Sequence, residues 1–148
     1  MSQDFSAWTI EHTISSDLSA GQRILDEVLS KIGCEGWSPR DLFGIRLALE
    51  EAVVNAIKHG NRLDKNKQVH VVCRSTCDVL WMRVADQGSG FNPEAVPDCT
   101  DPAHIDAPNG RGIMLMRNYM SRVEYNAAGN VVEMEKARPA STVRPNRP

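Results

Sequence analysis

Glu51 and Asn55 lie four residues apart in a strongly helical stretch of the sequence, so their side chains share one helix face. The amide oxygen of Asn55 can ligate a hard cation, and the carboxylate of Glu51 can take a proton or orient water. Such a pair suits a nucleotide site. Glu and Asn on a helix are usually solvated surface residues, however, so the pair alone does not identify a site.

A second motif, Asp86-x-Gly88-x-Gly90, follows a predicted strand. Glycine allows the backbone to turn sharply and lets a flat ligand approach it closely. The carboxylate of Asp86 is placed where it could accept a hydrogen bond from an exocyclic amino group such as that of adenine. An ordinary Asp-Gly turn is the alternative for this motif taken alone.

A third motif, Gly110-Arg111-Gly112, stands directly before a helix predicted over about 112–119, after a long polar loop over residues 92–109. Glycines at a helix N-terminus expose backbone N–H groups, and the helix dipole favours an anion there. These features suit a polyphosphate, to which Arg111 could also pair. Any loop-to-helix junction can carry such glycines, and an exposed arginine is the alternative for Arg111.

The helix that must position Glu51 and Asn55 has clear predicted ends. Ser38 can cap its N-terminus, and Pro39 suits its first position. Gly60 is a good C-terminal stop. The pair therefore lies near the C-terminal end of this helix, beside its apolar stripe.

The remaining elements follow from hydrophobic periodicity. Residues 5–14 predict a first strand. The apolar residues from 18 to 32 predict a helix capped by Ser15 or Ser16 and ended by Gly33. Further strands are predicted over 67–76, 79–85, 122–126 and 131–136, with hairpin turns at 76–78 and 128–130.

Length and composition predict one domain over residues 1–137, followed by a Pro- and Arg-rich tail, 138–148, that is expected to be disordered. The net charge of -2 argues against nonspecific nucleic-acid binding. The sequence has neither a signal-peptide pattern nor an apolar run of the roughly 20 residues that a membrane span needs, so a cytoplasmic protein is expected. The cysteines match no common zinc pattern, which favours reduced thiols over a metal or redox role: Cys34, Cys73, Cys77 and Cys99.

The glycine motifs do not fit the most familiar nucleotide-binding signatures. The sequence has no G-x-x-x-x-G-K-[ST] motif, which excludes a P-loop protein. The glycines also do not follow the first strand of a βαβ unit, which excludes a Rossmann fold.

Taken together, the order and spacing of the three motifs resemble the GHKL ATPase superfamily and, within it, the anti-sigma factor serine-protein kinases. The stretches that carry the resemblance are 47–61, 84–91 and 110–113, and it extends over about residues 5–137. It implies an α/β two-layer sandwich, the Bergerat ATP-binding fold, in which a mainly antiparallel sheet has helices on one face.

The resemblance also implies a role for each motif. Asn55 would ligate the Mg²⁺ that bridges the phosphates, Glu51 would be the general base on a substrate hydroxyl, and Asp86 would bind the adenine amino group. Residues 92–109 would form the lid. The implied nucleotide-binding residues are Asn55, Asp86, Gly88, Gly90, Gly110, Arg111, Gly112 and Asn130. Many relatives have Thr where this sequence has Asn130, which puts the nucleotide affinity in question.

The function that the resemblance implies is an ATP- and Mg²⁺-dependent serine/threonine-protein kinase that is also an anti-sigma factor. It would phosphorylate an anti-anti-sigma antagonist of the STAS type and sequester a sigma factor, and a homodimer is expected by analogy. The first alternative is a catalytically silent module that senses ATP or ADP and sequesters a regulatory partner. The second is a detached histidine-kinase catalytic domain.

Overall fold

The fold is a two-layer sandwich with one antiparallel sheet and helices on one of its faces. The computed structural model describes residues 7–89 and 110–139, and the side chains from residue 113 in the second range. The elements are β1 Trp8–Ser15, α1 Leu18–Ile32, α2 Pro39–Val54, the π-helix Asn55–Gly60, β2 Gln68–Ser75, β3 Val79–Ala85, α3 Gly110–Tyr119, β4 Arg122–Tyr125 and β5 Val131–Ala137.

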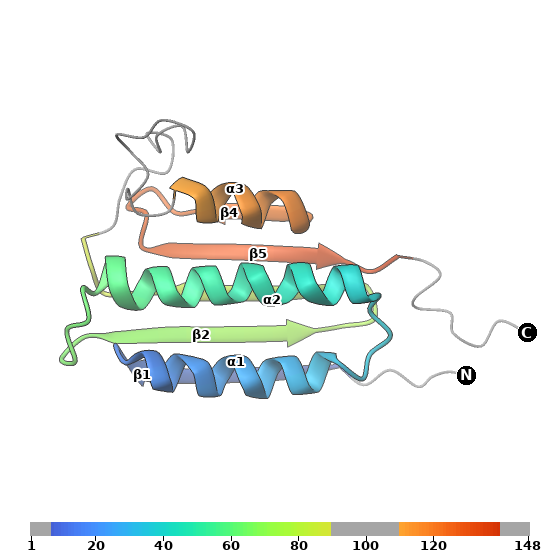
Figure 1. Ribbon diagram of the computed structural model, residues 1–148, viewed down its shortest axis with the longest axis horizontal. Helices are drawn as coiled ribbons and strands as arrows, with labels where there is room; N and C mark the ends of the chain where they lie inside the picture. The colour runs from blue at the N-terminus through green and yellow to red at the C-terminus, as the bar shows by residue number, and fades with distance from the viewer. Residues whose placement is uncertain (1–6, 90–109, 140–148) are drawn as a thin grey trace, which may run out of the picture.

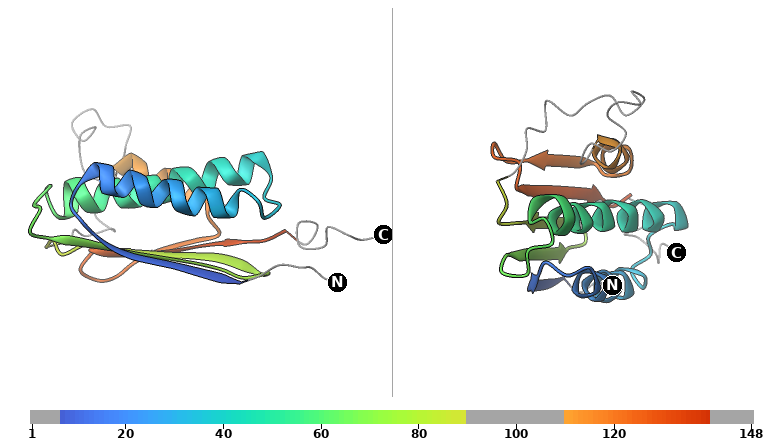
Figure 2. Two further views of the ribbon diagram at one scale, coloured as in Figure 1. Left: turned by 90° about the horizontal axis from the view of Figure 1, so that it is seen from below. Right: turned by 60° about the vertical axis from the view of Figure 1, so that its left-hand side comes forward.

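The five strands pair in the order β1-β2-β3-β5-β4, and every pairing is antiparallel. Figure 1 shows α2 lying along the middle of the sheet between α1 and α3, and Figure 2 shows the helices in one layer and the strands in the other. This arrangement confirms the predicted fold class.

The hydrophobic core lies between the two layers. Ile45 and Leu49 of α2 are fully buried, and so are Leu80 and Met82 of β3. Side chains alternate across a strand, so one face of β3 enters the core while Trp81 on the other face is only partly buried. Burying each large apolar side chain contributes roughly 1.5–3 kcal/mol, so α2 is held firmly against β3, the strand that Asp86 directly follows.

The site helix, which consists of α2 and the π-helix, carries Glu51 and Asn55. Both of its predicted ends are confirmed, but its last turn differs from the prediction. Ser38 caps α2, with the Asp41 N–H donating to Ser38 Oγ at 3.0 Å, and Pro39 is the first helical residue. The α-helix ends at Val54, and a π-helix continues to Gly60. Widened turns of this kind are rare and are frequently found at functional sites.

The predicted cap of the first helix is wrong. Neither Ser15 nor Ser16 caps α1: the cap is Asp17, whose side chain accepts from the Ser19 N–H at 3.2 Å. The hydroxyl of Ser16 is buried and donates to the Lys67 carbonyl at 2.8 Å. Ser16, which the local sequence offered as a cap, therefore forms a long-range hydrogen bond instead.

The folded unit extends beyond the predicted boundary at residue 137. The side chain of Arg138 is only 2% exposed and forms an ion pair with Glu35 at 2.8 Å. Its guanidinium also donates to the carbonyls of Thr76 and Glu35 and stacks on the Trp37 ring at 4.5 Å. Arg138 thus belongs to the fold rather than to the predicted tail, of which residues 140–148 lie outside the described residues. No helix in the described ranges is long and apolar enough to cross a membrane.

Candidate nucleotide-binding site

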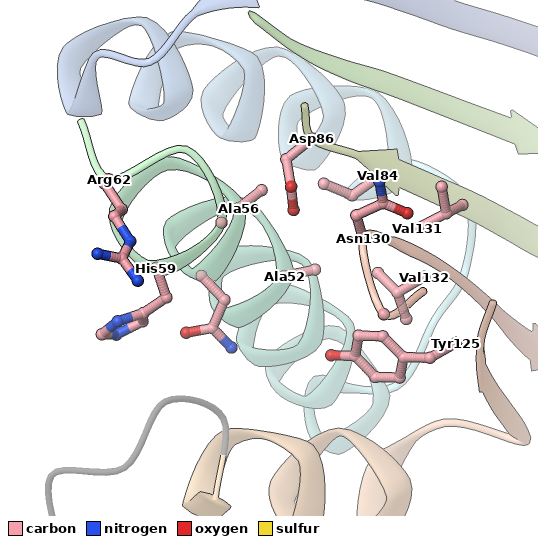
Figure 3. Close-up of a pocket in the computed structure, with 13 residues that line it drawn as sticks. Ala52, Ala56, His59, Arg62, Val84, Asp86, Tyr125, Asn130, Val131 and Val132 are labelled. Carbon is pink, nitrogen blue, oxygen red and sulfur yellow. The ribbon is translucent and has the colours of Figure 1, made fainter. Parts of the chain in front are cut away.

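A pocket opens at the end of the sheet where the π-helix meets the turn after β3 and the β4–β5 hairpin. Figure 3 shows Asp86, Asn130 and Tyr125 on the sheet side of this pocket, with Tyr125 below the other two, and His59 and Arg62 on the helix side. Three segments that are far apart in the sequence therefore contribute to one hollow. Its described lining is Ala52, Asn55, Ala56, His59, Gly60, Arg62, Val84, Asp86, Tyr125, Gly129, Asn130, Val131 and Val132.

Asp86 is held at the bottom of the pocket by its backbone and by the turn that follows it. Its N–H donates to the Asn130 carbonyl at 2.9 Å, and its side-chain Oδ1 accepts from the Gly88 N–H at 2.8 Å. Burial raises the pKa of the Asp86 carboxyl, while the Gly88 hydrogen bond and the charge of Lys67 oppose the rise. A partly buried carboxylate with an acceptor to spare suits recognition of an amino group.

Two glycines allow the helix end and the Asp86 turn to touch. A Cβ added at Gly60 would lie 2.3 Å from Asp86 Oδ2, and a Cβ added at Gly88 would lie 1.9 Å from the Gly60 carbonyl oxygen. Neither distance is sterically possible. The pocket therefore needs glycine at both positions, for the close approach of two segments rather than for turn formation.

Replacing Gly88 with alanine should push the turn away from the helix end. We expect nucleotide affinity to fall about tenfold or more, because forced overpacking typically costs about 1–3 kcal/mol. Calorimetric titration with ATP measures the change. Gly33→Ala is the control, since Gly33 ends α1 with an ordinary φ of -63° and its nearest Cβ contact is 3.1 Å. Equal ATP affinities of the two variants would contradict the steric argument.

Asn55 opens the π-helix, and its carboxamide lines the pocket. Its Nδ2 is buried and has no hydrogen-bond partner among the described residues. An unpaired buried polar group costs about 1–3 kcal/mol, so a ligand that pairs with this amide would recover that energy. The carboxamide therefore fits a site for a metal–phosphate group, with its oxygen as a ligand for a hard cation.

Glu51 lies one helical turn before Asn55 but is not among the described residues that line the pocket. It is partly buried, and burial raises the pKa of its carboxyl, with a smaller contribution from the charge of Glu50. Burial likewise raises the pKa of Tyr125 in the pocket, and the charges of Glu51 and Asp86 both act in the same direction. Glu51 therefore acts electrostatically on the pocket from beside it.

Of the other predicted site residues, the structure places only some in the described lining of the pocket. Asn130 lines the pocket, and its Nδ2 lies 3.5 Å from the Gly88 carbonyl. Gly110 to Gly112 form the first turn of α3 instead of preceding the helix. Gly90 and the predicted lid, 92–109, lie outside the described residues, as does Cys99. Within the described ranges no cluster of metal-ligating side chains occurs, and Cys34, Cys73 and Cys77 are free.

Sequence reasoning missed several pocket residues. His59 lines the pocket, and burial together with the charge of Lys58 lowers its pKa. Its spacing of four from Asn55 could have placed it there. Arg62 reaches the pocket from a left-handed backbone conformation with φ of 55°, and Tyr125 reaches it from β4. No local pattern marks either position.

Comparison with known proteins agrees with this geometry. Residues 14–136 match the histidine kinase-like ATPase domain, and the chain belongs to that family. Within it, the chain belongs with the serine-protein kinase RsbW: it is 30% identical to RsbW of Bacillus subtilis over 108 residues, which cover 68% of each chain. The resemblance seen in the sequence is thus confirmed.

Two further relatives are named as a protein kinase and as an anti-sigma factor. The serine/threonine-protein kinase BtrW of Bordetella bronchiseptica is 28% identical over 60% of this chain and 64% of its own. An anti-sigma F factor of Clostridium perfringens is 30% identical over 61% of this chain and 66% of its own. The chain thus spans just under two thirds of the length of these relatives.

A solved structure agrees on the fold. The crystal structure of the RsbU and RsbW domains of a Mycobacterium tuberculosis protein superposes on 89% of this chain and 33% of its own, with a TM-score of 0.56. Because the sequence identity is 18%, this likeness supports the fold alone.

Proposed function

We propose that this protein is an ATP-dependent serine/threonine-protein kinase and anti-sigma factor of a partner-switching system. It would phosphorylate an antagonist protein of the STAS type and sequester a sigma factor. Family membership and the names of the relatives support this proposal. The observation that carries it is the pocket itself, where the unpaired Asn55 amide and the Asp86 carboxylate face one hollow.

In this proposal each end of the pocket recognises a different part of ATP. Asp86 accepts a hydrogen bond from the adenine amino group, above the turn that Gly88 allows. Asn55 holds Mg²⁺ through its amide oxygen, and the first turn of α3 offers backbone N–H groups to the phosphates. Mg²⁺, when bound, neutralises the charge that develops on the phosphates.

Glu51 is the proposed general base. Its place beside the pocket suits a residue that meets the hydroxyl of an incoming protein substrate, rather than one that binds the nucleotide. A raised pKa also makes the carboxylate a better proton acceptor near neutral pH. The Glu51 carboxylate would take the proton of a Ser or Thr hydroxyl as that oxygen bonds to the γ-phosphorus, while the bond from the γ-phosphorus to the β,γ-bridging oxygen breaks and ADP leaves.

A phosphorylation assay tests the function directly. The purified protein is incubated with Mg-ATP and candidate STAS-domain proteins, and the product is examined by mass spectrometry for acid-stable phosphoserine or phosphothreonine. Acid-labile phosphohistidine would instead indicate a histidine-kinase catalytic domain. Tight ATP binding without transfer to any candidate would favour the silent nucleotide-sensing module.

The pH dependence of phosphoryl transfer should report the ionisation of Glu51. The base must be deprotonated, so the rate should rise with pH through a Glu51 pKa that lies above the ordinary value of 4.5. Removing the like charge with Glu50→Gln should lower that pKa and shift the acidic limb to lower pH. Initial rates at saturating Mg-ATP measure the shift. An acidic limb at the wild-type position in Glu50→Gln would show that the limb belongs to another group.

A further inference from the structure

Asn61 is a buried polar side chain directly after the π-helix, and none of the roles described above includes it. It is 1% exposed, and each polar atom of its carboxamide is used. Nδ2 donates to Ser16 Oγ at 2.8 Å and to the Gln68 carbonyl at 3.0 Å. Oδ1 accepts from the Gln87 N–H at 2.8 Å.

These bonds join four segments at one point. Ser16 follows β1, Gln68 begins β2, Gln87 belongs to the turn after β3, and Asn61 ends the site helix. A second connection runs parallel to the first, because the Gln87 side-chain oxygen accepts from the Gln68 N–H at 2.7 Å. The junction therefore holds the Asp86 turn to the sheet and to the helix end at the same time.

The π-helix explains how Asn61 reaches this junction. The Asn61 N–H donates to the carbonyl of Ala56, five residues back, at 2.8 Å. This wider turn changes the rotation of the chain relative to an α-helix. The chain then leaves the helix through Arg62 and Leu63, both in the left-handed region. Such strained backbone persists where surrounding contacts hold it, and the buried Asn61 bonds are contacts of that kind.

The junction connects the two segments that carry Asp86 and Asn55. Gln87 stands between Asp86 and Gly88, so the bond to its N–H fixes the turn that presents the Asp86 carboxylate. Asn55, the first residue of the π-helix that Asn61 follows, belongs to the other segment. A shift of the Gln87 amide would move Asp86 relative to Asn55.

We propose that Asn61 is a positioning residue that sets the base specificity of the nucleotide site by holding the Asp86 turn against the end of the site helix. The proposal rests on the proposed nucleotide site. The proposal predicts a change in nucleotide selectivity. Loss of Asn61 should weaken the binding of ATP more than the binding of GTP, because adenine offers an amino group to Asp86 where guanine offers a carbonyl oxygen.

The test compares Asn61→Ala and Asn61→Asp in the full chain, with Asn66→Ala as a matched control. Asn66 is an exposed asparagine in the adjacent turn, and among the described residues only its backbone N–H has a hydrogen-bond partner. Calorimetry gives the dissociation constants for ATP and GTP, and urea unfolding gives the stability. In Asn61→Ala we expect the ATP-to-GTP preference to fall about tenfold, which corresponds to one buried hydrogen bond.

Asn61→Asp separates positioning from stability. It keeps an acceptor for the Gln87 N–H but places a carboxylate against the Gln68 carbonyl, so its stability should fall at least as far as that of Asn61→Ala. Its ATP-to-GTP preference should nevertheless stay closer to wild type. A preference that follows stability across the variants would overturn the proposal, and so would a folded Asn61→Ala with wild-type preference.

Two provisions keep the result decisive. If Asn61→Ala does not fold, Asn61→Gln replaces it, because the longer side chain displaces the acceptor from the Gln87 N–H; an unchanged ATP-to-GTP preference in that variant overturns the proposal. If the wild-type protein binds neither nucleotide, the proposed function is wrong. If the wild-type protein binds ATP but the variants keep its ATP-to-GTP preference, only the role of Asn61 is wrong.

Discussion

Glu51→Gln should transfer phosphate to a protein substrate about 10²–10⁴ times more slowly than wild type, the range that a general base contributes. Its affinity for ATP should stay close to wild type, because Glu51 is not among the described residues that line the pocket. Glutamine keeps the size and polarity of the side chain and removes only its basicity. Single-turnover assays with a phosphorylatable antagonist measure the transfer step, and calorimetry measures ATP binding.

Asn55→Ala is the matched comparison, one helical turn away. It removes the proposed metal ligand from the pocket lining and should weaken Mg-ATP binding itself. The loss should be smaller when affinity is measured without Mg²⁺. If Glu51→Gln weakened ATP binding as strongly as Asn55→Ala, or transferred phosphate at the wild-type rate, the division of roles between the two residues would be wrong.

Arg138→Ala should destabilise the protein by about 3–5 kcal/mol, as expected when one partner of a buried ion pair is removed. The carboxylate of Glu35 would lose its charge partner in a site where its own side chain is only 12% exposed. It would keep hydrogen bonds from Ser75 Oγ, at 3.0 Å, and from the Trp8 indole, which places the expected loss toward the lower end. Urea unfolding measures it.

Arg122→Ala provides the control for charge and residue type. Arg122 pairs with Glu124 and Glu135, at 2.6 and 3.0 Å, but its side chain is 33% exposed. Pairs on a solvated face contribute at most about 1 kcal/mol. Similar losses in Arg122→Ala and Arg138→Ala would show that burial does not govern the Arg138 contact.

Local sequence patterns predicted most of the fold because they report local backbone preferences. Ser38 and Pro39 mark a helix start through capping and a preset φ, and alternation along residues 79–85 marks a half-buried strand. The predictions failed where a side chain bonds a distant segment. Ser16 bonds the start of β2 instead of capping α1, and Arg138 bonds Glu35, 103 residues away, instead of beginning a tail.

The sequence by itself determined the helix that carries Glu51 and Asn55 and the glycine motifs that point to a nucleotide, because residue type and spacing along one element are sufficient for these conclusions. The two-layer class followed from the resemblance of these motifs, taken together, to a known family. Only the tertiary structure decided that Asn55 and Asp86 share a pocket while Glu51 stands beside it. It also decided that the site helix ends in a π-turn at a buried asparagine. These features depend on long-range hydrogen bonds and burial, which no local pattern encodes.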